Sequence, residues 1–109
     1  MERDAEKYNG WSNYETWTVS LWLDNEQSSY AYWREQAALH RQAAHESPQV
    51  TEGTWTELEA ARFNLADQIE DEINTEMPLQ EPSMYSDLLR AALGEVNWME
   101  NAENWLADE

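Results

Sequence analysis

Hydrophobic residues recur every three or four positions through most of the chain, which is the spacing of one face of an α-helix. The strict alternation typical of a β-strand is absent, and three glycines offer few sites for tight β-turns. The pattern therefore predicts an all-α fold, a compact four- or five-helix bundle in which residues 1–109 form a single acidic helical domain. Residues 1–9 are polar and charged, and we expect them to be a flexible tail.

The first helix is expected to begin at Ser12, because Ser12 and Glu15 have the S-x-x-E spacing of a capping box. The apolar residues from Trp17 to Leu23 cover most of the helix circumference, so this helix is expected to be central and well buried. The polar pair Asp24-Asn25 is expected to end it.

A second helix is predicted from Ser28 or Ser29 to Ala44, followed by a loop that contains Pro48 and Gly53. The face of this helix that should point into the core holds Tyr30, Trp33, Ala37, His40 and Ala44. A third helix is predicted to begin with a T-x-x-E capping box and to end at a Met-Pro pair. The residues of that box are Thr54 and Glu57, the closing pair is Met77-Pro78, and the expected core stripe is Trp55, Leu58, Arg62, Leu65, Ile69 and Ile73.

Two further helices follow. Ser83 is expected to cap a fourth helix that ends at Gly94, and Asn97 together with Glu100 is expected to cap the last one. Their apolar faces hold Leu88, Leu89, Ala92 and Leu93 in the fourth helix, and Trp98, Ala102, Trp105 and Leu106 in the last. Tryptophan brings a large apolar area, so most of the seven tryptophans are expected in the core. These are Trp11, Trp17, Trp22, Trp33 and Trp55.

Charge is the outstanding feature of the composition. The chain has 23 Asp and Glu against six Lys and Arg, a formal net charge of -17, whereas a magnitude of about 2–8 keeps a small domain soluble. Residues 1–41 carry -3 of this charge and residues 42–109 carry -14. Because such repulsion destabilises a compact state, the excess favours a functional interpretation. It argues against direct binding of nucleic acid or membranes, and it favours a basic surface on another protein.

The residues that enzymes and metal sites need are scarce. The chain has no Cys, and His40 and His45 are five positions apart, on different faces of a helix. We expect His40 at the edge of the core with a hydrogen-bond partner. No zinc-protease, EF-hand, nucleophile-elbow or phosphate-loop motif is present. We therefore predict a protein that is not an enzyme and that has no metal site and no cofactor. A metal-dependent hydrolase, or a glycosidase that uses paired carboxylates, is the enzymatic alternative.

Targeting signals are also absent. The chain begins without an apolar signal segment, and no run approaches 18 apolar residues. The lack of Cys is typical of a reducing compartment. These observations predict a protein of the cytoplasm with no membrane association.

The acidic surface itself is the remaining candidate for a functional site. Carboxylates at positions i and i+4 of a helix lie about 6 Å apart along the axis, and duplex DNA carries one charge per roughly 1.7 Å. Two adjacent acidic helices could therefore present charge at a spacing comparable to that of phosphates. The first-choice contact residues, on the third helix, are Glu57, Asp67, Glu70, Asp71, Glu72 and Glu76. The second-choice residues are Glu95, Glu100, Glu103 and Asp108.

Residues 9–25 carry a long motif, N-G-W-S-N-Y-E-T-W followed by L-W-L-D-N. It resembles the N-G-W-x-N-Y-E-T-W-x-V-x-L-W-x-x-N motif of small uncharacterised phage and plasmid proteins, and V-N-W-M-E-N-A at residues 96–102 resembles a second, weaker part of it. Together these segments cover about a quarter of the chain. The resemblance implies a mobile-element origin and no particular activity. In size and charge the chain is also similar to DNA-mimic anti-CRISPR and anti-restriction proteins, although it shares no motif with the known anti-restriction families.

These observations predict an acidic DNA-mimic inhibitor of a host nucleic-acid-binding defence protein, either a CRISPR–Cas effector or a restriction enzyme, in the cytoplasm of a bacterial host. The inhibitor would occupy the DNA-binding groove of its target. The alternative is a phage or plasmid protein-interaction module that inhibits or bridges its target without mimicking DNA, through exposed aromatics such as Tyr85 or Trp98. A homodimer is compatible with the first interpretation, because two paired bundles would lengthen the charged track.

Overall fold

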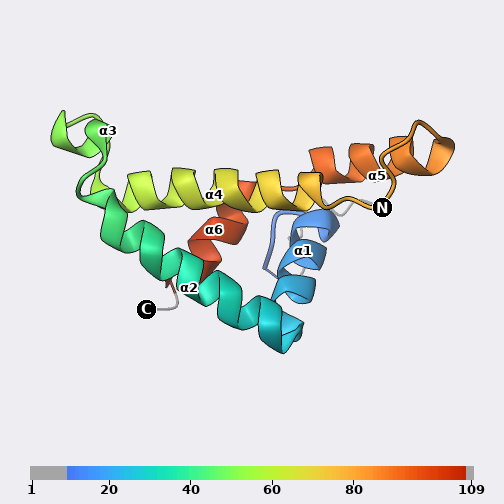
Figure 1. Cartoon of the computed structure of the whole chain (residues 1–109), viewed down its shortest axis with the longest axis horizontal. Coiled ribbons are helices and arrows are strands. Elements are labelled where there is room, and N and C mark those ends of the chain that lie inside the picture. Colours follow the sequence, from blue (N-terminus) through green and yellow to red (C-terminus); the bar gives the residue numbers. More distant parts are fainter. Residues whose placement is uncertain (1–9, 108–109) are drawn as a thin grey trace.

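A computed structural model describes residues 10–107, so the predicted flexible tail at residues 1–9 lies outside the described residues. The longer helices are α1 (Tyr14–Asn25), α2 (Gln27–Ala44), α4 (Glu57–Thr75), α5 (Met84–Gly94) and α6 (Trp98–Ala107) (Figure 1). A single turn, α3 (Pro48–Thr51), lies within the predicted loop, because proline suits the first turn of a helix. The described residues contain no β-strand, and the all-α bundle predicted from the sequence is confirmed.

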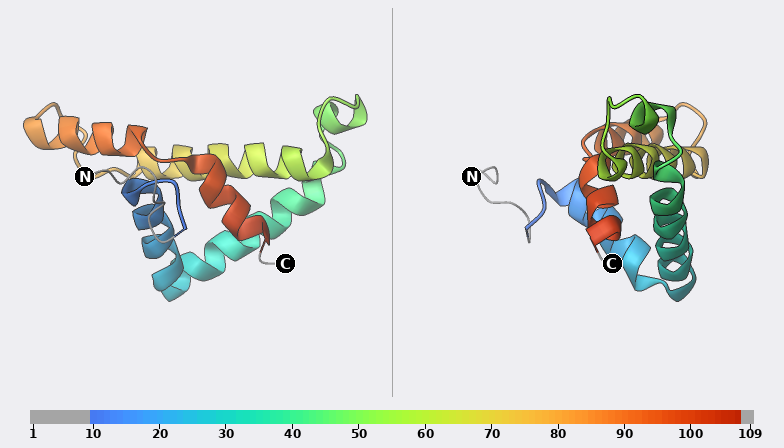
Figure 2. Two further views of the ribbon diagram at one scale, coloured as in Figure 1. Left: turned by 180° about the vertical axis from the view of Figure 1, so that it is seen from behind. Right: turned by 90° about the vertical axis from the view of Figure 1, so that its left-hand side faces the viewer.

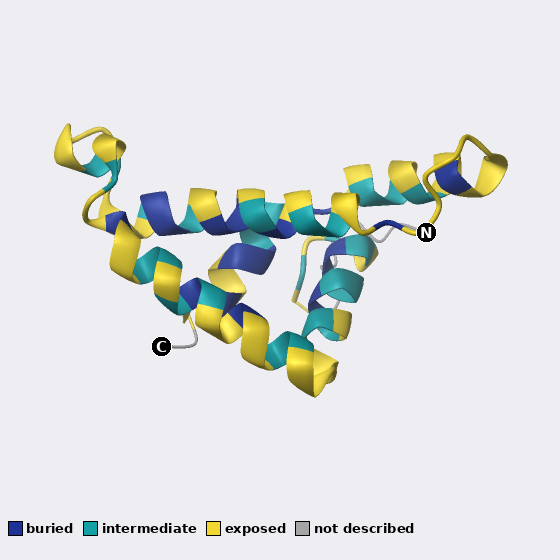
Figure 3. Ribbon diagram, in the orientation of Figure 1, coloured by how far each residue is buried: buried dark blue, intermediate teal, exposed yellow. Residues whose placement is uncertain are grey.

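Four helices form the body of the molecule. α1, α2 and α4 make the sides of a triangle, and α6 packs against all three of them (Figures 1 and 2). α5 begins beyond the C-terminal end of α4 and runs back toward it, and it packs sparsely against the other helices. The buried positions gather where α4, α6 and α2 face one another (Figure 3).

The core is built largely from small residues. Alanine is its commonest residue, and Leu65 and Ile69 of α4 are among its largest fully buried side chains. Small side chains allow the helix axes to approach closely. The core residues are Trp33, Ala37, Ala44, Ala60, Ala61, Leu65, Ala66, Ile69, Ala102, Trp105 and Leu106.

The N-cap of α1 is Asn13, one residue after the predicted Ser12. The Asn13 side chain accepts a hydrogen bond from the Thr16 backbone N–H at 2.8 Å. Ser12 instead donates its hydroxyl to the Glu100 carboxylate at 2.6 Å. Asn and Ser are equally good N-caps, so the tertiary contact of Ser12 decides between them.

The capping box of α4 consists of Thr56 and Glu59, so the predicted pair of Thr54 and Glu57 is wrong. Both pairs have the same T-x-x-E spacing. The backbone N–H of Thr54 donates to the Gln49 carbonyl at 2.8 Å, which holds this segment against α3 and outside the helix. The predicted caps at Ser83 and Asn97 are confirmed by their hydrogen bonds to the third residue of each helix.

α1 lies at the periphery, which corrects its predicted central and well-buried position. Its buried residues are the polar Thr16 and Ser20, whereas Trp22 is 64% exposed. The apolar side chains of α1 surround the helix and give it no single direction, and its polar side chains face α6 instead. Leu58 and Leu88 are also largely exposed, contrary to their predicted core positions, because one lies in the first turn of α4 and the other on the projecting α5.

A hydrogen-bond network, which we call the α1–α6 clasp, joins the two ends of the described chain. Fully buried Asn101 donates to the Thr16 carbonyl at 3.2 Å and to the Ser20 hydroxyl at 2.8 Å. The Thr16 hydroxyl accepts from the Asn97 backbone N–H at 2.8 Å. The clasp comprises Ser12, Asn13, Thr16 and Ser20 on one side, and Glu95, Asn97, Glu100 and Asn101 on the other. The two segments that resemble phage and plasmid proteins therefore meet in space.

Replacing Asn101 should destabilise the bundle. We expect Asn101→Ala to lower the free energy of unfolding by about 1–2 kcal/mol, because the buried hydroxyl of Ser20 loses its donor. The matched control is Asn104→Ala, an exposed site on the same helix where the gain in helix propensity is the same. Urea unfolding followed by circular dichroism measures both, and equal midpoints for the two variants would show that the clasp adds no stability.

Candidate functional site

Three of the predicted contact residues, Asp67, Glu70 and Asp71, gather on the outward face of α4, and we call them the outward cluster. All three are exposed, and with Asn74 they line an open depression. Asp67 and Asp71 are one helical turn apart, and Glu70 lies on the same face. Within residues 10–107, none of these carboxylates forms an ion pair.

The position of the outward cluster works against helix stability. It lies in the C-terminal half of α4, and the last turn of this helix holds no basic residue that could offset its charge. Asp67 with Asp71, and Glu72 with Glu76, are like charges at i,i+4, and each such pair costs an isolated helix about 0.2–0.5 kcal/mol. The packing of α4 on α2 and α6 therefore maintains a helix that its own charges oppose.

Three other predicted residues have partners inside the protein. Glu103 forms an ion pair with Arg62 at 2.8 Å, Glu100 belongs to the clasp, and Glu72 accepts a hydrogen bond from Tyr32 at 2.7 Å. These carboxylates have a structural role in the isolated chain. The remaining predicted residues are Glu57, Glu76 and Glu95, which are exposed, and Asp108, which lies outside the described residues.

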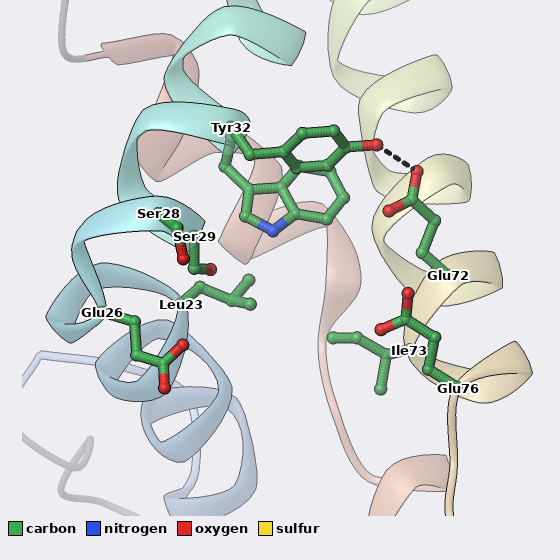
Figure 4. Close-up of a pocket in the computed structure, with 9 residues that line it drawn as sticks. Leu23, Glu26, Ser28, Ser29, Tyr32, Glu72, Ile73 and Glu76 are labelled. Carbon is green, nitrogen blue, oxygen red and sulfur yellow. Dashed lines mark hydrogen bonds between the residues drawn. The ribbon is translucent and has the colours of Figure 1, made fainter.

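An open cleft of about 500 Å³ lies between the α1–α2 corner and the C-terminal half of α4 (Figure 4). Glu26 stands on one wall, Glu72 and Glu76 stand on the other, and their carboxylates turn toward the space between the walls. The apolar side chains of Leu23 and Ile73 lie between them. The cleft is lined by Leu23, Glu26, Ser28, Ser29, Tyr32, Trp33, Glu72, Ile73 and Glu76.

Sequence reasoning missed Glu26 and Tyr32 as site residues. Glu26 occupies the one-residue junction between α1 and α2, so it belongs to no helix face that a periodic pattern could indicate. Tyr32 and Glu72 are 40 positions apart. No signal in a single sequence joins them, because their proximity depends on how α2 packs against α4.

A hydrogen-bond network holds one wall of the cleft in place. Tyr32 donates to Glu72 Oε2 at 2.7 Å, and Gln68 Nε2 donates to the same oxygen at 2.8 Å and to Gln36 Oε1 at 2.9 Å. The Gln68 Oε1 atom lies 2.6 Å from His40 Nε2. Since an amide oxygen only accepts, His40 must carry a proton on Nε2. His40 is half-buried and hydrogen-bonded, as the sequence predicts.

Glu72 raises the pKa of Tyr32 above its ordinary value. The hydrogen bond from the phenol to the Glu72 carboxylate is the main cause, because ionisation of the phenol would remove the donor. Partial burial and the negative charges of Glu72 and Glu76 act in the same direction, whereas the hydrogen bond from Gln68 acts against them. A phenol with a raised pKa stabilises the fold below its unfolded pKa of about 10, and that stabilisation is lost as pH rises through the folded value.

The Tyr32 phenol should therefore ionise later than an ordinary tyrosine. Subtracting the near-ultraviolet phenolate titration of Tyr32→Phe from that of the parent protein isolates Tyr32, and we expect its midpoint above pH 10. Glu72→Gln should move the midpoint down, because an amide accepts more weakly and carries no charge. Glu70→Gln removes the same charge from the outward face and should leave the midpoint nearly unchanged. An equal shift in both variants would rule out the hydrogen bond as the main cause.

Within residues 10–107, no group of three or more His, Asp or Glu side chains is placed to hold a metal ion. No helix in the described part of the chain is long and apolar enough to cross a membrane.

Neither the curated proteins nor the solved structures provide a match to this chain. The model of DUF7249, a family of unknown function, matches residues 4–105, and the chain belongs to this family.

Proposed function

We propose that this protein inhibits a nucleic-acid-binding protein by occupying its cationic groove, as an acidic mimic of DNA. The outward cluster carries the proposal. Its three carboxylates are exposed and form no ion pair within the described residues, and Asp67 and Asp71 are like charges one turn apart on α4. Charge placed at a cost to stability favours a role outside the fold, and a cationic partner surface would offset the repulsion.

Binding would need no chemistry. A groove that holds DNA through Lys and Arg would accept the carboxylates of α4 in place of phosphates, and the bundle would block the groove sterically. Long-range attraction between a protein of net charge -17 and a basic groove would make association fast and strongly dependent on salt.

The target class rests on the resemblance to phage and plasmid proteins. A mobile element gains from blocking host nucleases, so we propose a CRISPR–Cas effector or a restriction enzyme in the bacterial cytoplasm as the target. Among the motif residues, Asn13 and Thr16 of the first segment and Asn97, Glu100 and Asn101 of the second make contacts of the clasp. Their structural role supports a division in which the clasp maintains the scaffold and the acidic residues of α4 contact the target.

The exposed apolar face of α5 favours a second candidate, a protein-interaction module that does not mimic DNA. Met84, Tyr85 and Leu88 are each more than 60% exposed, and they lie on the helix that projects from the bundle. Exposed aromatic and apolar side chains of this kind are typical of interface hot spots. In this case the protein could bind its target beside bound DNA.

Neutralising the outward cluster should weaken inhibition. A pulldown from host lysate would supply the target, and binding to that purified protein would then be measured by surface plasmon resonance. We expect the triple variant Asp67→Asn, Glu70→Gln, Asp71→Asn to lower the association rate about tenfold at low salt, with a smaller effect at high salt. Circular dichroism should show unchanged helicity, and duplex DNA should displace the parent protein.

The charge-matched control neutralises Glu35, Glu52 and Glu81, three exposed acids outside α4. This variant has the same net charge, so the same loss of binding in both variants would show that only total charge matters. A stable ternary complex of target, DNA and inhibitor would exclude mimicry. If Tyr85→Ala then abolished binding, the α5 candidate would take its place.

A further inference from the structure

The cleft between the α1–α2 corner and α4 combines negative charge with apolar and aromatic surface. Glu26 faces Glu72 and Glu76 across it, and Leu23 and Ile73 lie between the walls (Figure 4). We propose that this cleft binds an arginine side chain of the partner protein. The identification of the occupant as a partner residue rests on the proposed function, but the cleft and its ligand chemistry are independent of the outward cluster.

The charges in the cleft are available to a ligand. The side chains of Glu26 and Glu76 make no hydrogen bond or ion pair with the described residues, and Glu26 does not cap α2 with its side chain. Glu72 uses Oε2 for both Tyr32 and Gln68, so Oε1 can accept from a ligand. A cation between the walls would reach carboxylates from two sides.

The rest of the lining selects the kind of cation. The carboxylates are not placed to hold a metal ion, so an organic cation suits the cleft better. The apolar Leu23 and Ile73 suit an aliphatic stem, and Tyr32, which is 39% exposed and packs edge-on with Trp33, adds aromatic surface to the lining. A planar guanidinium stacks on aromatic rings and carries five donors for separate acceptors, whereas an ammonium is compact and strongly hydrated. These features favour arginine over lysine.

The cleft also lies beside the proposed contact surface. Glu72 follows directly after Asp71 on α4 and Glu76 is the C-cap of this helix, and both lie on the side that faces α2. An arginine inserted in the cleft would anchor a partner whose other cations contact the outward face. A basic groove lined with several arginines could supply both contacts at once.

The test uses the full-length protein and N-acetyl-arginine amide as the probe. Two-dimensional ¹H–¹⁵N NMR at constant ionic strength follows the backbone amides during the titration. We expect saturable shifts at Ser28, Ser29 and Ile73, and no comparable shifts near the outward cluster. N-acetyl-citrulline amide has the same stem with a neutral urea, and it should leave the spectrum unchanged.

Two double variants with equal net charge locate the site. Glu26→Gln with Glu76→Gln should weaken arginine binding about tenfold, because two charged acceptors are lost. Asp67→Asn with Asp71→Asn should change it less than about twofold, because exposed charges at a distance are screened. The citrulline comparison uses the unmutated chain, so the test stands even if a double variant is unstable.

Three results would overturn the proposal: shifts spread over every acidic face, equal weakening in both double variants, or binding of N-acetyl-lysine amide as tight as that of the arginine amide. If the cleft did not bind arginine, the prediction that the outward cluster competes with DNA for the groove of the partner would still stand. Conversely, if arginine bound in the cleft but the protein did not compete with DNA, the arginine site would be supported and DNA mimicry would be excluded.

Discussion

The α1–α6 clasp is the interaction on which the rest of the structure depends. It joins residues 12–20 to residues 95–101, and it does so through buried polar groups such as Asn101 and Thr16. Because the core is rich in alanine, burial of apolar surface gives this bundle less stabilisation than a core of larger residues would. By holding the N-terminal half of α1 against α6, the clasp also fixes the position of the C-terminal end of α1. The α1–α2 corner, with Leu23 and Glu26, therefore stands opposite α4 and forms one wall of the cleft.

The carboxylates of α4 and α6 divide into two groups by what they contact. Glu72, Glu100 and Glu103 each accept from a donor of the protein, so their charges are part of the fold. The outward cluster has no such donor within the described residues. Total charge alone does not make this distinction. It matters for interpretation, because a carboxylate oxygen without an internal donor can bind a cation without breaking an existing contact. Each acid of the outward cluster offers two such oxygens, whereas Glu72 offers one, Oε1.

Much of the fold is encoded in local patterns, and the sequence predicts those parts well. The core positions of Leu65 and Ile69 on α4, the caps at Ser83 and Asn97, and the end of α5 at Gly94 all depend on residues within a few positions of one another. The errors occur where a distant contact decides between equal local signals. Asn13 rather than Ser12 caps α1, because the Ser12 hydroxyl donates to Glu100. The predicted burial of α1 is wrong because the interface of α1 with α6 is polar, whereas hydrophobic periodicity detects only apolar interfaces.

The candidate site also has one part that local sequence patterns predict and one part that depends on distant contacts. Exposed acids on α4 can be predicted, since charges opposite an apolar stripe must face outward. The cleft cannot, because Glu26, Tyr32 and Glu76 converge only through the packing of three helices. Its existence changes what kind of partner is expected. With carboxylates on two sides of one helix, a flat basic patch could contact either the outward cluster or the cleft. A concave cationic surface, such as a groove that encloses a duplex, could contact both at once, so the geometry of α4 favours a groove over a patch.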